Sequence, residues 1–215
     1  MPDDHYAVQA RLYDRFVESM NAPLRQAARR LLPPEAGSVV LDVGCGTGAA
    51  LAEYRESGCT VIGVDPSPAM IEQARRRLGP DADLRLVGGT RIPVDDASVD
   101  LVLISLVLHS VTRDEATGIL REAARVLSPR GRVLVTDFGA SGLRFPRGWL
   151  ARGVTVLAEL AAGPHHAANS WDYWRRGGLT PLVEAAGLSV RAARPTAGGA
   201  ITIAVLSLPT EAERR

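Results

Sequence analysis

The most informative stretch of the chain is residues 39–54, VVLDVGCGTGAALAEY. An apolar run that is typical of a buried strand ends at Val43 and carries one carboxylate, Asp42. Glycines follow at positions 44, 46 and 48, and a helix-like pattern begins at Ala49. Glycine lets the backbone turn sharply and approach a ligand with no side chain in the way. Such a turn usually holds phosphates, so the carboxylate at its edge raises the question of which ligand it binds.

The spacing of the glycines does not identify the ligand, because Gly44, Gly46 and Ala49 also satisfy the dinucleotide pattern G-x-G-x-x-A. Asp42 is more informative. A carboxylate about 4 Å from a pyrophosphate, at an effective dielectric of about 20, is repelled by roughly 4 kcal/mol. S-adenosylmethionine has no phosphate and carries an ammonium and a sulfonium group. The carboxylate of Asp42 therefore favours a cationic ligand of this kind.

A second carboxylate, Asp65, ends the next apolar run, VIGVD. An acidic residue at the end of the second strand can accept hydrogen bonds from both ribose hydroxyls of an adenosine ligand. NAD and S-adenosylmethionine both contain this ribose. Asp65 therefore indicates an adenosine ligand without deciding between the two.

The composition of the chain is ordinary and indicates no particular class of binding partner. Its 215 residues suit one domain, 46% are hydrophobic, and the formal net charge is +1, so nothing requires a nucleic acid or an anionic membrane. The two cysteines, Cys45 and Cys59, have no metal-type spacing to a histidine and are expected to be free thiols in a reducing compartment. The opening residues MPDDHY lack a signal-peptide pattern, and the longest apolar stretch, LVLISLVL, is too short to span a bilayer. We expect a cytoplasmic protein.

Apolar runs alternate with helical patterns along the chain, which predicts βαβ units and a parallel sheet with helices on both faces. Ligands of such sheets bind at the carboxyl ends of the strands, near the point where the strand order reverses. The strands are expected at residues 39–43, 59–65, 84–89, 99–108 and 131–138, with a final pair at 188–194 and 201–207, and the main helices at residues 6–32, 49–57, 68–78 and 113–127.

Four segments carry a family resemblance. VVLDVGCGTG, VIGVDPSPAMIEQARRRL, IPVDDASVDLVLISLVLHSV and LREAARVLSPRGRVLVTDF, which together span residues 39–138, resemble the successive motifs of class I S-adenosylmethionine-dependent methyltransferases. The similarity is closest to the small-molecule group that includes quinone-biosynthesis enzymes. It implies an α/β, Rossmann-like, doubly wound and mostly parallel seven-stranded sheet with an antiparallel last strand and a small helical substrate insert.

The resemblance also implies one methyltransferase domain over residues 1–215. Its expected parts are an N-terminal helical cap (1–36), a cofactor-binding core (37–138), a helical substrate insert (139–180) and a final helix with a strand pair (181–215).

The cofactor contacts implied by the resemblance lie in several loops. They are Asp42, Gly44, Cys45, Gly46 and Gly48 around the methionine part, Asp65 at the ribose, Pro66 and Met70 beside the adenine, Gly89 and Thr90 in the third loop, Ser105 and Leu106 after the fourth strand, and Tyr13 closing over the cofactor. One departure is clear. The family usually has an acidic residue in the third loop that accepts from the adenine amino group, whereas LRLVGGTRIP has Gly88 and Gly89 there. Losing that hydrogen bond weakens binding by ~1 kcal/mol.

Candidate catalytic residues are histidines. His109 follows the fourth strand and is the first candidate for a general base, because a neutral histidine near pH 7 suits that role; His165 and His166 come second. A satisfied structural histidine is the alternative for His109. No metal site is expected.

The segment from residue 141 to 176 contains all three tryptophans, Trp149, Trp171 and Trp174. They are expected to form an apolar wall over the methyl acceptor, with packing onto the sheet as the alternative. Leu150, Val154 and Leu157 recur there at helical spacing.

The sequence therefore predicts S-adenosylmethionine-dependent methyl transfer to a small organic acceptor by direct in-line displacement. A non-catalytic S-adenosylmethionine-binding sensor or partner domain is the alternative from another class. A NAD-dependent oxidoreductase is a further alternative that depends on the G-x-G-x-x-A match. A nucleic-acid acceptor is not expected, since the net charge is small and no basic stripe is present.

Overall fold

The computed structural model of the chain describes residues 21–140 and 142–214. The chain divides into two compact units, Met1–Pro33 and Pro34–Arg215. The described part of the first unit is helical over residues 21–31. The second unit contains the sheet.

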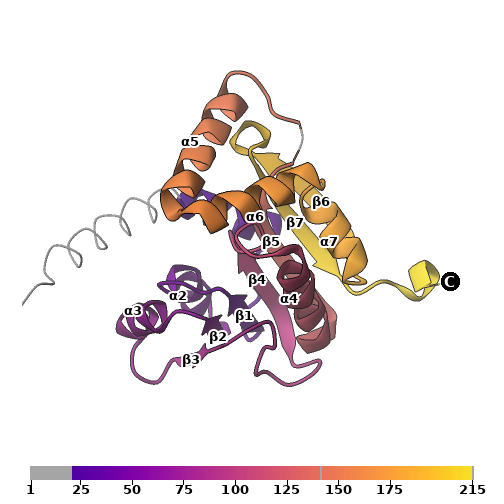
Figure 1. Cartoon of the computed structure of the whole chain (residues 1–215). Helices are drawn as coiled ribbons and strands as arrows, with labels where there is room; N and C mark the ends of the chain where they lie inside the picture. Colours follow the sequence, from indigo (N-terminus) through magenta and orange to yellow (C-terminus); the bar gives the residue numbers. More distant parts are fainter. Residues whose placement is uncertain (1–20, 141, 215) are drawn as a thin grey trace, which may run out of the picture. The chain divides into compact units, whose positions relative to one another are not determined.

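The sheet has seven strands in the order β3-β2-β1-β4-β5-β7-β6 (Figure 1). Neighbouring strands are parallel except at β7, which runs antiparallel to both β5 and β6. This confirms the predicted mostly parallel sheet with an antiparallel last strand. The strands are β1 (Val39–Val43), β2 (Thr60–Asp65), β3 (Asp83–Leu86), β4 (Val99–Ser105), β5 (Leu127–Phe138), β6 (Ser189–Thr196) and β7 (Ile201–Ser207).

The strand order reverses between β1 and β4. The chain moves outward from β1 to β2 and β3, then returns to place β4 on the other side of β1. Asp42 of β1 is in register with Gly63 of β2 and Leu103 of β4. Since ligands of such sheets bind beyond the carboxyl ends of the strands at this reversal, the glycine turn after β1 lies where a ligand is expected.

Two helices hold the glycine turn in place. They are α2 (Ala49–Glu56) and α3 (Pro68–Leu78). The hydroxyl of Ser67 accepts a hydrogen bond from the Met70 N–H at 3.4 Å and caps α3, with Pro68 in the first turn. Buried side chains from α2, α3 and the turn form one apolar cluster: Cys45, Leu51, Ile71 and Leu78.

The connection from β3 to β4 contains no helix. The guanidinium of Arg125, on α4 (Arg113–Val126), donates hydrogen bonds to the carbonyls of Ile92 at 2.7 Å and Val94 at 2.9 Å. The carboxylate of Glu122 accepts from the Ile92 N–H at 2.9 Å. An Arg–Glu pair on one helix thus holds a loop in the place that a crossover helix usually takes.

Between β5 and α7 (Leu179–Ala185) the chain forms two further helices, α5 (Arg147–Ala162) and α6 (Pro164–Arg175). Figure 1 shows α6 beside the ends of β4 and β5. The amide of Asn169 on α6 donates a hydrogen bond to the Ser110 carbonyl, in the loop after β4, at 2.9 Å. This contact places the helical segment next to the carboxyl edge of the sheet.

Candidate active site

The turn after β1 requires glycine at specific positions. Gly44, Gly46 and Gly48 have φ values of 74°, 52° and 74°, which side chains rarely adopt. A Cβ on Gly44 would lie 2.5 Å from a methyl carbon of Val107, and one on Gly48 would lie 3.1 Å from the Cβ of Ala74. A Cβ on Gly46 would meet nothing within 4 Å. The turn is therefore packed at its two ends and open in its middle.

Asp65 joins this turn to α3. It is 7% exposed, and its Oδ2 accepts a hydrogen bond from the Gly46 N–H at 2.9 Å while its Oδ1 accepts one from the Ser67 N–H at 2.8 Å. A carboxylate offers about four acceptor sites, so each oxygen keeps capacity for a further donor. The bond from Gly46 also directs one amide of the turn to a carboxylate, which makes the turn less suited to a phosphate.

Asp42 and Cys45 lie in the same small region. Asp42 is 3% exposed. Burial raises the pKa of the Cys45 thiol, and the negative charges of Asp42 and Asp65 raise it further. Both carboxylates therefore lie close enough to Cys45 to act on it, and the thiol stays protonated. Neither Cys45 nor Cys59 forms a disulfide, and a protonated Cys45 lacks the properties of a nucleophile.

The loop after β4 has an unusual backbone. Leu106 adopts a left-handed conformation with φ 58°, and its N–H donates to the Thr136 carbonyl at 2.7 Å. A non-glycine residue in this region costs on the order of 1 kcal/mol, and such residues cluster at functional sites. Ser105, the last residue of β4, is half-buried beside it.

The remaining predicted cofactor residues are more scattered. Pro66 and Gly89 are exposed and Met70 is half-buried. Thr90 packs against α4, because a Cβ on Gly118 would lie 3.0 Å from its methyl carbon. Tyr13 lies outside the described residues. The structure thus brings Asp42, Asp65 and the three glycines together, while Thr90 turns its side chain toward a helix.

A buried polar cluster lies next to this turn and centres on His109, which is 4% exposed. Its Nδ1 lies 2.6 Å from Oδ1 of Asp137, at the end of β5, and its Nε2 lies 3.4 Å from Oε1 of Glu159 on α5. The ring stacks on Phe138 with a centroid distance of 3.7 Å. His109 therefore connects the edge of the sheet to the helical segment.

The two carboxylates have further partners. Asp137 accepts hydrogen bonds from the N–H groups of Leu108 at 2.8 Å and Phe138 at 2.7 Å. The hydroxyl of Ser170 donates to Oε2 of Glu159 at 2.7 Å, and Nδ1 of His166 lies 3.8 Å from the same oxygen. Every member of the cluster is thus held by at least one polar contact.

The surroundings of His109 bear on the expectation that it is a neutral base. Burial alone lowers the pKa of its imidazole, but Asp137 and Glu159 more than offset burial and raise that pKa to about 9. Burial raises the pKa of Glu159, whereas hydrogen bonds from His109 and Ser170 bring it below its usual value. Both ring nitrogens of His109 thus lie against carboxylates, and this raised pKa favours the protonated imidazole at neutral pH.

The three tryptophans have different surroundings. Trp174 is half-buried, its ring lies 5.4 Å from that of Phe138, and the Arg152 guanidinium lies 4.3 Å above it. Trp149 and Trp171 are 64% and 59% exposed. Of the three tryptophans, Trp174 is the one that packs beside the cluster around His109, through its contact with Phe138. His165, the third candidate base, is exposed on α6.

Sequence reasoning missed Asp137, Glu159 and Ser170. Asp137 had a usable signal, since it lies one residue before the end of the fifth predicted strand, at the edge where His109 is also expected. Glu159 is the only acidic residue in an apolar helix, and that isolation was a weaker signal. Nothing in the local pattern marks Ser170.

Within the described residues, no group of three or more His, Cys, Asp and Glu side chains could hold a metal ion. None of the described helices combines the length and the apolar character needed to cross a membrane.

Comparisons with known proteins identify relatives. Residues 41–135 match the family model described as "Methyltransferase domain". A demethylmenaquinone methyltransferase from Tropheryma whipplei (strain Twist) is 39% identical over 137 residues, which cover 60% of this chain and 55% of that protein. The ubiquinone/menaquinone biosynthesis C-methyltransferase UbiE of Rubrivivax gelatinosus is 30% identical over 176 residues, which cover 78% of this chain and 67% of that protein.

The chain spans about half the length of the demethylmenaquinone methyltransferases that it matches. Among solved structures, a TehB-like SAM-dependent methyltransferase from Corynebacterium glutamicum has a TM-score of 0.65 and 20% identity, covering 95% of this chain and 98% of that one. This likeness shows that the two proteins share a fold. The family match includes the glycine turn, Asp65 and His109, and it ends before Asp137 and the helical segment.

Proposed function

The chain belongs to the class I S-adenosylmethionine-dependent methyltransferases, in the group related to quinone-biosynthesis enzymes, and from this premise we propose that it transfers a methyl group from S-adenosylmethionine to a small organic acceptor. The observation that carries the proposal is the pair of buried carboxylates, Asp42 and Asp65, on either side of the glycine turn. A cationic, phosphate-free nucleoside suits this charge.

Asp65 is the proposed ribose ligand. Two of its acceptor sites bind the Gly46 and Ser67 N–H groups, and the other sites can accept the ribose hydroxyls. The open middle of the turn at Gly46 leaves room for the methionine part of the cofactor. The other proposed cofactor contacts are Asp42, Gly44, Gly48, Pro66, Met70, Ser105 and Leu106.

The chemistry makes few demands on the protein. The acceptor atom attacks the methyl carbon in line with the sulfur, the carbon–sulfur bond breaks, and the positive charge of the sulfonium is lost. Because the methyl group is already activated, alignment of the two reactants is the main contribution of the protein, and orientation is worth roughly 7–11 kcal/mol.

We assign His109 a positioning role. As a cation with both nitrogens bound to carboxylates, it has no free nitrogen to accept a proton. Its contact with Glu159 instead fixes α5 against the sheet. Trp174, beside Phe138, is the tryptophan best placed to contact an acceptor near this cluster.

A small-molecule acceptor is supported by the relatives, which are named as menaquinone and ubiquinone methyltransferases. The net charge of +1 gives no support to a nucleic-acid acceptor. We also infer a cytoplasmic location. The NAD-dependent oxidoreductase and the non-catalytic sensor receive no support from the family match.

Calorimetry tests the cofactor proposal. The wild-type protein should bind S-adenosylhomocysteine, and Asp65→Ala should weaken that binding about 100-fold, because two hydrogen bonds to a charged group are lost. The matched control is Asp81→Ala, an exposed aspartate in the turn after α3, which should bind normally. Urea unfolding of both variants shows that the fold persists. Saturable binding of NAD, with no response to S-adenosylhomocysteine, would reverse the assignment.

Turnover distinguishes an enzyme from a sensor. Release of S-adenosylhomocysteine from S-adenosylmethionine, in the presence of a panel of phenols, quinols and amines, should depend on one class of acceptor. Tight cofactor binding without release for any acceptor would favour the non-catalytic alternative.

A further inference from the structure

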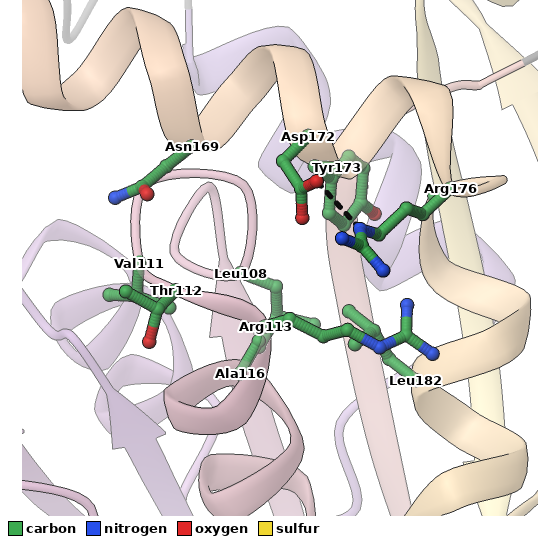
Figure 2. A pocket seen from close by; sticks show the side chains of 11 residues that line it. Leu108, Val111, Thr112, Arg113, Ala116, Asn169, Asp172, Tyr173, Arg176 and Leu182 are labelled. Atoms are coloured by element: carbon green, nitrogen blue, oxygen red, sulfur yellow. Dashed lines mark hydrogen bonds and ion pairs between the residues drawn. The ribbon is translucent and has the colours of Figure 1, made fainter.

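A pocket of about 250 Å³ lies beside the cluster, between the loop after β4, the start of α4, α6 and α7 (Figure 2). The loop that forms one wall also contacts the glycine turn, since it contributes Val107 to Gly44 and Leu108 to the pocket. The pocket is therefore adjacent to the proposed cofactor site without including any residue proposed to bind the cofactor. Its apolar lining consists of Leu108, Val111, Ala116 and Leu182.

The charged lining is unbalanced. Two arginines, Arg113 on α4 and Arg176 just after α6, and one aspartate, Asp172, line the pocket. Arg176 donates to Asp172 at 2.6 Å, which leaves the positive charge of Arg113 unmatched within the lining. Figure 2 shows the guanidinium groups of Arg113 and Arg176 on the same side of the pocket.

Nothing in the described part of the chain pairs with the Arg113 guanidinium. Two acidic residues follow it in the first turn of α4, Asp114 and Glu115, but neither lines the pocket. The carboxylate of Glu115 is bound to Thr112, whose N–H donates to it at 2.9 Å. Asp172 is thus the one negative group in the lining, and Arg176 already binds it.

Tyr173 supplies a second and independent observation. This residue also lines the pocket, is 7% exposed, and has a buried hydroxyl for which no described residue provides a hydrogen-bond partner. A buried hydroxyl without a partner is unfavourable by about 1–3 kcal/mol. A ligand that reached this hydroxyl and accepted its hydrogen bond would remove this penalty.

We propose that this pocket binds a small organic anion, a carboxylate or a phosphate monoester on an apolar skeleton. The planar guanidinium of Arg113 matches the geometry of either anionic group, and the apolar lining suits a ring or short chain. Cavities of about 150 Å³ hold benzene, so the volume here accommodates one ring with its ionised substituent. The proposal goes beyond the proposed methyl transfer and does not depend on it.

Titration of the ¹⁵N-labelled protein, without cofactor, tests the proposal with benzoate and phenyl phosphate as probes. Both should shift the amide resonances of residues 108–116, and the uncharged analogue benzamide should bind at least about tenfold more weakly, because it cannot form charge-assisted hydrogen bonds with Arg113. Arg113→Ala should weaken benzoate about tenfold or more, while Arg113→Lys, which keeps the charge, should retain part of the binding. The matched control is Arg130→Ala, an exposed arginine near the opposite ends of the strands.

Equal affinity for benzamide and benzoate, equal loss in the two alanine variants, or an absence of shifts at residues 108–116 would each overturn the proposal. A second experiment, with 4-hydroxybenzoate and S-adenosylmethionine, shows whether the bound anion is the methyl acceptor or a separate ligand. If the anion is the acceptor, the phenol oxygen takes the methyl group, its proton goes to solvent, and S-adenosylhomocysteine leaves. If it is a separate ligand, 4-hydroxybenzoate binds in an Arg113-dependent way and no methyl ether forms.

Discussion

Glu159→Gln tests how much the contact between Glu159 on α5 and His109 contributes to the stability of the protein. Glu159 faces Nε2 of His109 at 3.4 Å, on the side opposite the 2.6 Å contact between Nδ1 and Asp137. Glutamine has nearly the same shape but no charge. The substitution should therefore leave the packing of α5 intact while it removes one of the two negative groups that keep His109 protonated.

The structure sets the size of the effect. A pKa of about 9 for folded His109, against 6.5 in the unfolded chain, corresponds to about 3 kcal/mol of stability shared between two carboxylates. Asp137 is the nearer partner, so Glu159 should account for the smaller part. We expect Glu159→Gln to lower the proton affinity of His109 about tenfold, which equals about 1.4 kcal/mol.

The sign of the pH dependence follows from the direction of the shift. Because the pKa of His109 is higher in the folded state, this stabilisation is fully present below pH 6.5 and is lost as pH rises through about 9. Wild-type protein should lose stability across this range, and Glu159→Gln should lose less. On the acid side, the pKa of Glu159 is lowered on folding, so its contribution disappears as pH falls below about 4.5.

Urea unfolding at pH 6, 7.5 and 9.5, together with NMR titration of the His109 ring, provides the assay. Glu184→Gln, at an exposed glutamate on α7, is the matched control and should follow wild type. At pH 7.5 the Glu159 variant should be less stable than wild type by about 1 kcal/mol, and the difference should shrink at pH 9.5. The same pH profile in Glu159→Gln and wild type, or a wild-type His109 that titrates near 6.5, would refute the reasoning.

Three further stability predictions can be checked by urea unfolding. Gly48→Ala should lower the free energy of unfolding by about 2 kcal/mol, because the left-handed backbone is strained and the new methyl group meets Ala74. Gly46→Ala should lower it by only about 1 kcal/mol, from backbone strain alone, and equal losses would contradict the packing argument. Trp174→Ala should lower the free energy of unfolding by about 3 kcal/mol, and Trp171→Ala, at an exposed ring, by less than about 0.5 kcal/mol. A larger loss in Trp171→Ala than in Trp174→Ala would contradict the positions of these two rings. Arg125→Met should cost about 2 kcal/mol by freeing the loop between β3 and β4, and an unchanged midpoint would show that the loop does not need it.

The sheet could be predicted because its signals are local. Apolar runs of strand length alternate with helical patterns, and the end of each run marks the carboxyl edge where Asp42 and Asp65 lie. The cap at Ser67 is local as well, because serine followed by proline is typical of a helix start. The preference of the glycine turn for a cationic ligand could be inferred from the order of residues along one strand and turn alone.

The surroundings of His109 could not be predicted, because they depend on contacts between distant parts of the chain. Asp137 is 28 residues away, and Glu159 lies on a helix whose direction relative to the sheet is not written in its own pattern. A protonated and a neutral histidine look identical in sequence. Its charge is decided by two carboxylates that only the fold brings together.

The apolar stripe of α5 shows a related difficulty. Leu150, Val154 and Leu157 recur at helical spacing, which usually marks a buried face, yet they are 69%, 49% and 68% exposed. Periodicity identifies a stripe but not the surface that covers it. For the same reason, three tryptophans in one segment could not be separated into one that packs and two that are exposed.

A crystal structure of the protein with S-adenosylhomocysteine tests the central claim most directly. We expect both ribose hydroxyls within hydrogen-bonding distance of Asp65, and the amino-acid end of the ligand beside Asp42 over the turn of residues 44–48. A ligand whose ribose lies away from Asp65, or a diphosphate group seated over that turn in a competing NAD complex, would contradict it.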